Sequence, residues 1–313
     1  MNKITIIGSG SVGSTIAYTL TVMGLASEIV MIDINGEKAL GEALDIRQGT
    51  PFCNPSSIYA GSYADAAGSN IVIITSGLAR KPGQTRLDLA QVNVDITKSI
   101  IPEIVRYAPN AFYVIVSNPV DILTYTFHKV SGLPESQIIG SGTILDTARL
   151  RSRISEYFSV NQKNVHAYVL GEHGDSSFIP WSIANISNVP IEDFASSVKS
   201  DTFYPELNRA EIEEYVRKSG ARVIQRKGAT FYAVSISVCH VCKCLLSGID
   251  TTMTVSTMLH GEYGISDVCL SLLNVVGDKG AHSKVLLPLN DEEVRALHKS
   301  ADTLKEIIKE LKF

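Results

Sequence analysis

A glycine-rich turn between an apolar run and a helical pattern constrains this sequence more than any other feature. Residues 3–7 form a short apolar run, Gly8-Ser9-Gly10-Ser11-Val12-Gly13 follows at once, and residues 14–23 have a helical pattern. Glycines at these positions let the backbone approach a pyrophosphate, and the N–H groups at the start of the helix favour its negative charge. The sequence therefore predicts a dinucleotide site here. Its candidate residues are Gly8, Gly10, Ser11, Val12 and Gly13.

An acidic residue supports the same prediction. The apolar run at residues 28–32 ends in Asp33, twenty residues past Gly13. A carboxylate at this spacing accepts hydrogen bonds from a ribose diol. It also repels a ribose phosphate, so Asp33 favours NAD over NADP.

Apolar runs and helical patterns then alternate through the first half of the chain. The runs lie at residues 57–60, 70–75 and 111–116, with helical patterns at 38–47 and 87–107. This alternation predicts an α/β fold with a doubly wound parallel sheet. Ligands bind beyond the carboxyl ends of such strands. The segments that fall there are residues 76–86, beginning with Ser76 and Gly77, and Ser117-Asn118-Pro119.

The loop at residues 76–86 carries three cations, Arg80, Lys81 and Arg86, and two glycines. It is either a solvated loop or a lid. Arginines at this edge of a sheet suit a carboxylate or a developing oxyanion, and the glycines favour closure over a ligand.

A second domain is expected after Gly140, where the alternation fades. Because 313 residues exceed the size of a single core, we expect domains at residues 1–140 and 141–313. The expected helices of the second domain are 143–158, 206–226, 230–246 and 291–311, and its expected strands are 165–170, 252–259, 269–276 and 285–289.

His173 is the leading candidate for chemistry in that domain. It stands in Gly171-Glu172-His173-Gly174-Asp175, directly after the apolar run at residues 165–170. A histidine at a strand end is held firmly, and it exchanges its proton near neutral pH. A histidine that merely caps a strand has the same local pattern. Asp146 and Arg149 share one face of their helix, either as a surface ion pair or as part of a site.

Composition excludes several kinds of partner. The net charge is −4 without basic clusters, so neither nucleic acid nor a membrane surface is expected. No apolar run approaches the roughly 18 residues of a membrane span. The N-terminus lacks the apolar region of a signal peptide, and we expect a cytoplasmic protein.

The five cysteines raise the question of a metal. Their odd number, without a secretory signal, predicts free thiols. Cys239, Cys242 and Cys244 lie in an expected helix, but Cys244 diverges from the face that the other two share, and no second ligand pair follows. We expect buried thiols and no metal.

Together these motifs resemble the L-lactate and malate dehydrogenases, and most of the chain is similar to the bacterial L-lactate dehydrogenases. The likeness runs from end to end. Besides the glycine turn it rests on residues 85–89, 117–121, 140–149, 171–175 and 227–230. It implies a Rossmann domain that binds NAD, an α+β substrate-binding domain, and the interconversion of a 2-oxo acid and an L-2-hydroxy acid.

The resemblance also implies roles for single residues. His173 would be the general acid and base, and Asp146 would fix its tautomer and raise its pKa. Arg149 would hold the substrate carboxylate and Arg86 would polarise the carbonyl.

Two further residues of the pocket follow from the same resemblance. Asn118, after which a cis peptide bond is expected, would bond the substrate oxygen and lie beside the cofactor. Thr230 would line the far side of the pocket.

One position departs from the lactate pattern. Lactate dehydrogenases usually carry glutamine six residues before the polarising arginine, whereas similar malate dehydrogenases carry arginine, as Arg80 does here. An arginine fork removes most of the cost of burying the second carboxylate of oxaloacetate. We therefore expect oxaloacetate to be accepted and even preferred, with specificity for pyruvate as the alternative.

The resemblance extends to regulation and assembly. Arg151 and His166 occupy the positions at which bacterial lactate dehydrogenases bind the activator fructose bisphosphate, so either an activator site or an ordinary surface pair is expected. The family also implies a homotetramer.

Two other classes of protein fit the sequence less well. A hydrolase using His173 with Asp175 or Ser176 lacks a Gly-x-Ser-x-Gly elbow. A non-enzymatic NAD sensor would lack at least one of the four residues expected to carry out the reaction. All four are present: Arg86, Asp146, Arg149 and His173.

Overall fold

The computed structural model describes residues 2–78, 86–199 and 206–313. Its main feature is one nine-stranded sheet. Six parallel strands come first, in the spatial order β3-β2-β1-β4-β5-β6, and three antiparallel strands, β10, β11 and β12, continue the sheet beyond β6. The bounds are β1 (Lys3–Ile7), β2 (Glu28–Ile32), β3 (Ser57–Ala60), β4 (Ile71–Ile74), β5 (Phe112–Ile115), β6 (Ile138–Gly140), β10 (Thr251–His260), β11 (Ser266–Gly277) and β12 (Gly280–Val285).

The central parallel strands are apolar throughout because both faces of the sheet are covered. Alternate residues of β4 face opposite sides, so that Ile71 and Ile73 join one core cluster and Val72 and Ile74 the other. The first cluster lies under α1 and α8, and the second lies under α3 and α4. This arrangement confirms the predicted doubly wound sheet.

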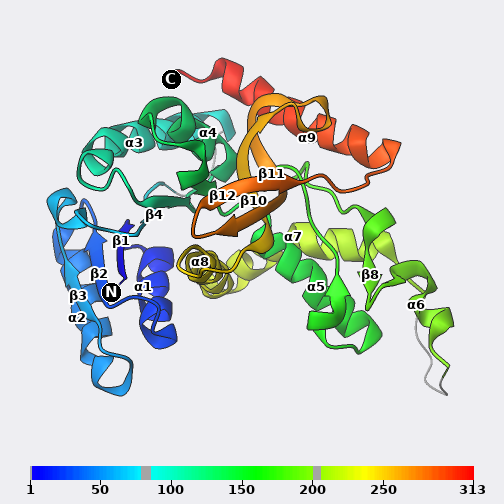
Figure 1. Cartoon of the computed structure of the whole chain (residues 1–313), viewed down its shortest axis with the longest axis horizontal. Coiled ribbons are helices and arrows are strands. Elements are labelled where there is room, and N and C mark those ends of the chain that lie inside the picture. The colour runs from blue at the N-terminus through cyan, green and yellow to red at the C-terminus, as the bar shows by residue number, and fades with distance from the viewer. Residues whose placement is uncertain (1, 79–85, 200–205) are drawn as a thin grey trace.

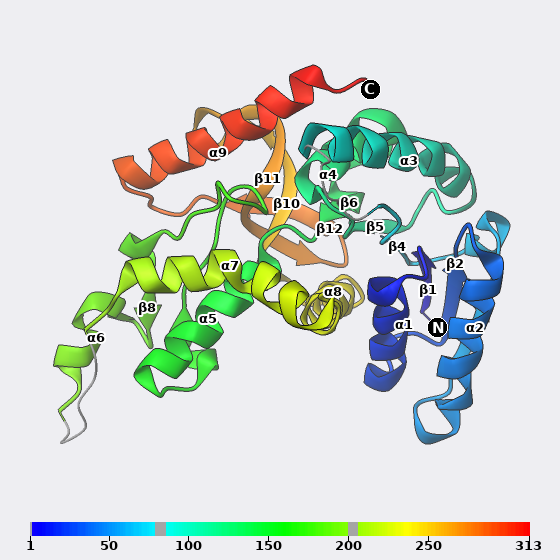
Figure 2. The same cartoon turned by 180° about the vertical axis from the view of Figure 1, so that it is seen from behind.

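Helices surround the sheet (Figure 1). Figures 1 and 2 both show α8 between α1 and α7, and α9 running across the far end of β10 and β11. The bounds are α1 (Ser11–Met23), α2 (Gly36–Gln48), α3 (Arg86–Tyr107), α4 (Val120–Ser131), α5 (Ile144–Phe158), α6 (Ile191–Ser197), α7 (Arg209–Lys227), α8 (Tyr232–Leu245) and α9 (Asp291–Glu310).

A smaller sheet and a third core cluster lie in the second half of the chain. The sheet pairs β7 (Val165–His166), β8 (Asn185–Ile186) and β9 (Val189–Pro190) in antiparallel order. Beside it, Leu150 and Ile154 of α5 pack with Ile212 of α7. Strand β10 nevertheless pairs with β6 of the first half, Ser256 opposite Gly140. The sheet thus crosses the expected boundary, and the division at residue 140 stays a prediction.

Two expected strands were wrong. Of residues 285–289 only Val285 lies in a strand, because the hairpin turns directly after Gly277 and pairs Gly277 with Gly280, so that the polar β12 ends at Val285. Pro288, which has no N–H, follows in irregular backbone.

Of the expected strand at residues 165–170, only Val165–His166 pairs as a strand. The Val169 backbone instead bonds to two threonines at the start of α5. Thr147 Oγ1 accepts from Val169 N at 2.9 Å, and Thr143 Oγ1 donates to Val169 O at 2.5 Å.

The five cysteines are free, and four of them are buried. Over the described ranges, no three or more acidic, histidine or cysteine side chains gather as metal ligands. None of the described helices has the length and apolar composition needed to cross a membrane.

Candidate active site

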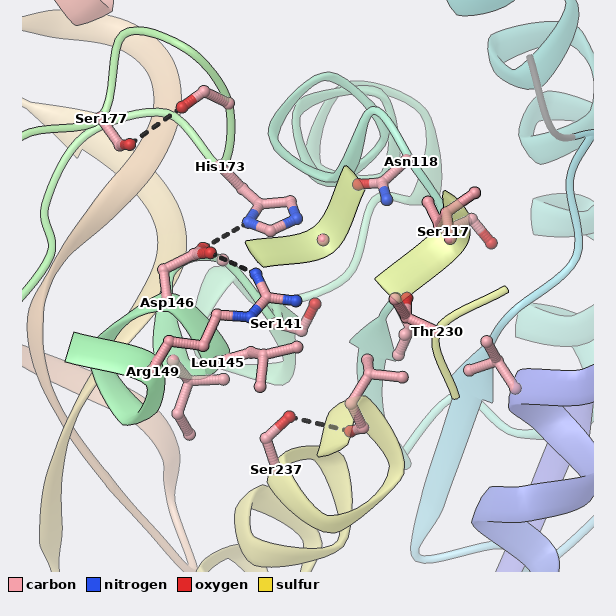
Figure 3. A pocket seen from close by; sticks show the side chains of 18 of the residues that line it. Ser117, Asn118, Ser141, Leu145, Asp146, Arg149, His173, Ser177, Thr230 and Ser237 are labelled. Carbon is pink, nitrogen blue, oxygen red and sulfur yellow. Dashed lines mark hydrogen bonds and ion pairs between the residues drawn. The ribbon is translucent and has the colours of Figure 1, made fainter. Parts of the chain in front are cut away.

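A cleft of about 480 Å³ opens where β4, β5 and β6 end (Figure 3). Thr75 and Gly77 follow β4, Asn118 follows β5, and Ser141 follows β6. Helices α5, α7 and α8 form the opposite wall, so the cleft lies between the sheet and the second half of the chain. The wall contributes Leu145, Asp146, Arg149, Val216, Arg217, Gly220, Ala221, Ile224, Val234 and Ser237.

The glycine turn has the shape that a pyrophosphate requires. A Cβ on Gly8, whose φ is +103°, would lie 2.7 Å from Ser76 N, and one on Gly13 would lie 1.9 Å from Gly8 O. A Cβ on Gly10 would meet nothing within 4 Å. Gly10 is the N-cap of α1 and supplies no side-chain cap, so the first N–H groups of the helix remain available to an anion.

The other predicted residues of the turn lie beside the cleft. Ser11 is exposed at the start of α1 and Val12 lines the cleft. Asp33 accepts from Ser9 N at 2.6 Å and from Asn35 N at 2.8 Å, which places the end of β2 against the glycine turn. A carboxylate has about four acceptor positions, so these two bonds leave capacity for a ribose diol. The turn and Asp33 therefore fit a bound dinucleotide.

His173, Asp146 and Arg149 form one connected group in the cleft. His173 Nδ1 lies 2.6 Å from Asp146 Oδ2, and Arg149 Nη1 donates to Asp146 Oδ1 at 2.8 Å. Figure 3 shows the second ring nitrogen of His173 turned away from Asp146, on the side of Asn118. The structure thus brings together the three residues that the sequence placed on two separate segments.

Charges in this group shift two pKa values in opposite directions. Burial by itself lowers the pKa of His173, but the charge of Asp146 and its hydrogen bond outweigh burial, so the pKa is raised. Burial likewise raises the pKa of Asp146, but His173 and Arg149 outweigh it, and the pKa is lowered. The pair is therefore stabilised as imidazolium and carboxylate.

Contacts from distant segments hold the loop that carries His173. Gly171, with φ of +91°, exchanges backbone hydrogen bonds with Ser271 of β11. Ser300 Oγ of α9 accepts from Glu172 N at 2.7 Å. Asp121 Oδ2 of α4 accepts from His173 N at 2.7 Å. Sequence reasoning did not identify Ser300 or Asp121 as partners of this loop.

The segments that end β4 and β5 are tied to each other. Asn93 of α3 accepts from Leu78 N at 2.8 Å and donates to Asn118 O at 2.8 Å. Ser117 Oγ donates to Ser76 O at 2.6 Å. The Asn118–Pro119 peptide bond is cis, as predicted. Asn93 and Ser117 therefore position residues expected at the cofactor, although the sequence did not single them out for it.

The remaining predicted site residues fall in different places. Thr230 lines the cleft between α7 and α8. Arg80 and Lys81 lie outside the described residues, and so does the side chain of Arg86, the residue that opens α3.

The two residues expected to bind an activator lie away from the cleft. Arg151 Nε donates to Ala167 O at 3.1 Å, and its guanidinium lies 5.2 Å from the centre of the Tyr168 ring. Burial lowers the pKa of Arg151. His166 is exposed on β7.

The hydrolase alternative receives no support from the geometry. The Ser176 hydroxyl donates to the Glu172 carboxylate, and it lies 3.1 Å from Ser300 Oγ. Among the described residues, the hydrogen bond of the His173 ring is to Asp146. No serine nucleophile is therefore paired with His173 in the described part of the chain.

A dinucleotide turn at the end of a parallel sheet, beside a histidine–aspartate pair and an arginine, defines the class of nucleotide-dependent oxidoreductases. Two family models identify the family. The model for the lactate/malate dehydrogenase NAD binding domain matches residues 2–140, and the model for the lactate/malate dehydrogenase alpha/beta C-terminal domain matches residues 143–312. The chain belongs to the lactate/malate dehydrogenase family, and its cofactor is NAD.

Individual relatives agree over the whole chain. An L-lactate dehydrogenase of Acetivibrio thermocellus is 47% identical over 311 residues, which cover 99% of this chain and 98% of that protein. L-lactate dehydrogenase 1 of Clostridium acetobutylicum is 46% identical, covering 97% and 96%. The crystal structure of the minor L-lactate dehydrogenase from Enterococcus mundtii superposes with a TM-score of 0.94 at 35% identity, covering 100% and 99%.

Proposed function

We propose that this protein is an NAD-dependent L-2-hydroxy acid dehydrogenase of the L-lactate dehydrogenase type, which interconverts a 2-oxo acid and an L-2-hydroxy acid. The observation that carries the proposal is the position of Asp146, which joins the His173 ring to the Arg149 guanidinium inside the cleft. The relatives described above, which are named L-lactate dehydrogenase, support it.

His173 would act as the general acid and base. With Nδ1 bonded to Asp146, the proton that moves is the one on Nε2, which His173 gives to the carbonyl oxygen during reduction and recovers during oxidation. Asp146 stabilises the imidazolium that must be present before reduction. When bound, the NAD cofactor supplies the hydride chemistry at the carbonyl carbon of the substrate.

Arg149 would bind the carboxylate of the substrate. One of its five N–H donors bonds to Asp146, so the others remain for a bidentate contact. Gly220 of α7 lies directly beside this guanidinium, since a Cβ on Gly220 would be 3.7 Å from Arg149 Nη2.

The other polar groups complete the proposed substrate site. Asn118 and Thr230 would contact the substrate from the sheet side and from the α7–α8 junction respectively. Arg86 would polarise the carbonyl, and Ser76 and Gly77 would contact the cofactor.

Two 2-oxo acids are candidates, and different observations favour them. The names of the relatives favour pyruvate and lactate. Arg80 favours oxaloacetate and malate, because an arginine fork offsets the cost of burying a second carboxylate. We propose pyruvate as a substrate and oxaloacetate as a second one accepted through Arg80.

Activation and assembly extend the proposal. Arg151 and His166 would bind fructose bisphosphate, with the same residues of a second subunit completing the site. The family resemblance implies a homotetramer, and its interfaces would cover exposed apolar side chains such as Tyr18, Phe52 and Ile236. Sedimentation of the purified protein tests the tetramer.

The test of the activity is NADH oxidation with pyruvate and with oxaloacetate, each with and without fructose bisphosphate. Turnover of either acid is expected, together with its loss in H173Q. NADH binding without turnover of either acid would overturn the proposal and favour a non-catalytic NAD sensor. A rate that fructose bisphosphate leaves unchanged would overturn the activator site alone.

A further inference from the structure

A second aspartate, besides Asp146, contacts His173. Asp121 lies in the first turn of α4, three residues after Asn118, and its Oδ2 accepts from His173 N at 2.7 Å. The residue is 2% exposed, and the Ser256 hydroxyl of β10 is a second hydrogen-bonding group beside its carboxylate. Burying a carboxylate costs stability even when it accepts hydrogen bonds. A neutral amide would hold the same backbone N–H at a smaller cost, so the charge itself points to a role.

We propose that Asp121 is a positioning residue for His173, holding its backbone and placing a second negative charge beside it so that the histidine keeps its proton until substrate is bound. This inference rests on the proposed function, because it concerns the acid in that reaction. It assigns the two aspartates different parts: Asp146 acts on the ring, and Asp121 acts on the main chain and through its charge.

The groups around the pair fix the sign of the effect. Asp146 and Arg149 face His173 from α5, Glu172 precedes it in the loop, and Cys269 faces Asp121 from β11. Burial raises the pKa of Asp121 to about 6, against the opposing effects of the Ser256 hydroxyl, the His173 N–H and the His173 charge. Asp121 is therefore mostly ionised above pH 6, where an ordinary histidine loses its proton, and its charge raises the pKa of His173.

The position of Asp121 in the chain adds a geometric consequence. Asn118 stands at the start of the segment whose helix carries Asp121, and Asn93 holds the Asn118 carbonyl. The Asp121 bond to His173 N therefore links the residue proposed to contact the substrate oxygen with the residue proposed to protonate it. A shift of α4 moves both groups together.

The test is the pH dependence of kcat/KM for pyruvate reduction in wild type, D121N and the control T126V. D121N keeps an oxygen acceptor for His173 N and removes only the charge. T126V changes an equally buried side chain of α4 that bonds within its own helix, to Ile122 O. In D121N the alkaline limb is expected to move down by about one pH unit, a roughly tenfold loss at high pH with the acid plateau retained. T126V should match wild type.

An alkaline limb that stays in place in D121N overturns the inference, as does an equal loss at all pH values, which indicates a structural role only. Wild type without any 2-oxo acid reduction would instead overturn the proposed function, so the two failures are distinguishable.

If D121N does not fold, proton uptake by wild type decides. It is measured by calorimetry as oxamate, an isostere of pyruvate, binds to the enzyme–NADH complex in buffers of different ionisation enthalpy. Two interacting groups give an uptake curve broader than that of a single group. A single-group curve overturns the inference.

Discussion

Asp146 Oδ2 lies 2.6 Å from His173 Nδ1, and the other oxygen of the same carboxylate lies 2.8 Å from Arg149 Nη1. One side chain therefore orients both the proposed proton donor and the proposed anchor of the substrate. Because Asp146 and Arg149 are three residues apart on α5, the helix itself sets the distance between those two functions.

The His173–Asp146 pair should make stability depend on pH. The folded-state pKa of His173 is raised above the ordinary value of about 6.5, so its stabilisation is complete below that value and is lost as pH rises through the raised pKa. The difference in unfolding free energy between wild type and H173Q should therefore be larger at pH 6 than at pH 9. Urea denaturation measures it, and a difference independent of pH would contradict the ionised pair.

Replacing Arg149 by lysine should weaken substrate binding while cofactor binding is kept. Lysine retains the charge but loses the planar fork, so kcat/KM for a 2-oxo acid should fall by about a hundredfold or more, mainly through KM. Steady-state kinetics and NADH fluorescence titration measure the two effects. R153K is the matched control, because Arg153 lies one turn further along α5 and pairs with Glu211 at 2.7 Å. Equal losses in the two variants would argue against a special role for Arg149.

Two alanine substitutions in the glycine turn should impair the protein in different ways, one its stability and the other its affinity for NADH. In G13A the new Cβ would lie 1.9 Å from Gly8 O, so the protein itself should be destabilised, by about 1–3 kcal/mol or more. In G10A the Cβ meets no protein atom within 4 Å, so stability should be kept while NADH affinity falls at least tenfold. Thermal unfolding with and without NADH separates the two, and unimpaired NADH binding by G10A would place the pyrophosphate elsewhere.

The proposed role of Arg80 in substrate choice is tested by removing its charge. In R80Q the second carboxylate of oxaloacetate loses its partner, so kcat/KM for oxaloacetate should fall by about a hundredfold relative to that for pyruvate. K81Q removes the neighbouring charge and is the control for a general effect of charge. A ratio that stays the same in R80Q would assign specificity to the rest of the cleft.

Local patterns explain why much of the fold was predictable. The glycine turn, the apolar strands around it and the helices of the first half each follow from residues within one short segment. The resemblance also singled out His173, Asp146 and Arg149, which the structure brings together, while their roles stay predictions.

Other contacts of the site depend on packing between distant segments. Asp121 and His173 are 52 residues apart, and Glu172 and Ser300 are 128 apart. No local pattern identifies such partners. The end of β12 was missed for a similar reason, since the register set by Gly277 and Gly280 outweighs the apolar run that follows.

The pairing of Ser256 with Gly140 makes β6 and β10 neighbours in one sheet. Separating the chain at residue 140 would therefore expose two strand edges, one of them on the ten-residue, largely buried β10. Exposed strand edges of this kind associate with one another. The two halves expressed apart are thus prone to aggregate, and the nucleotide-binding half cannot be treated as a module to be transplanted alone.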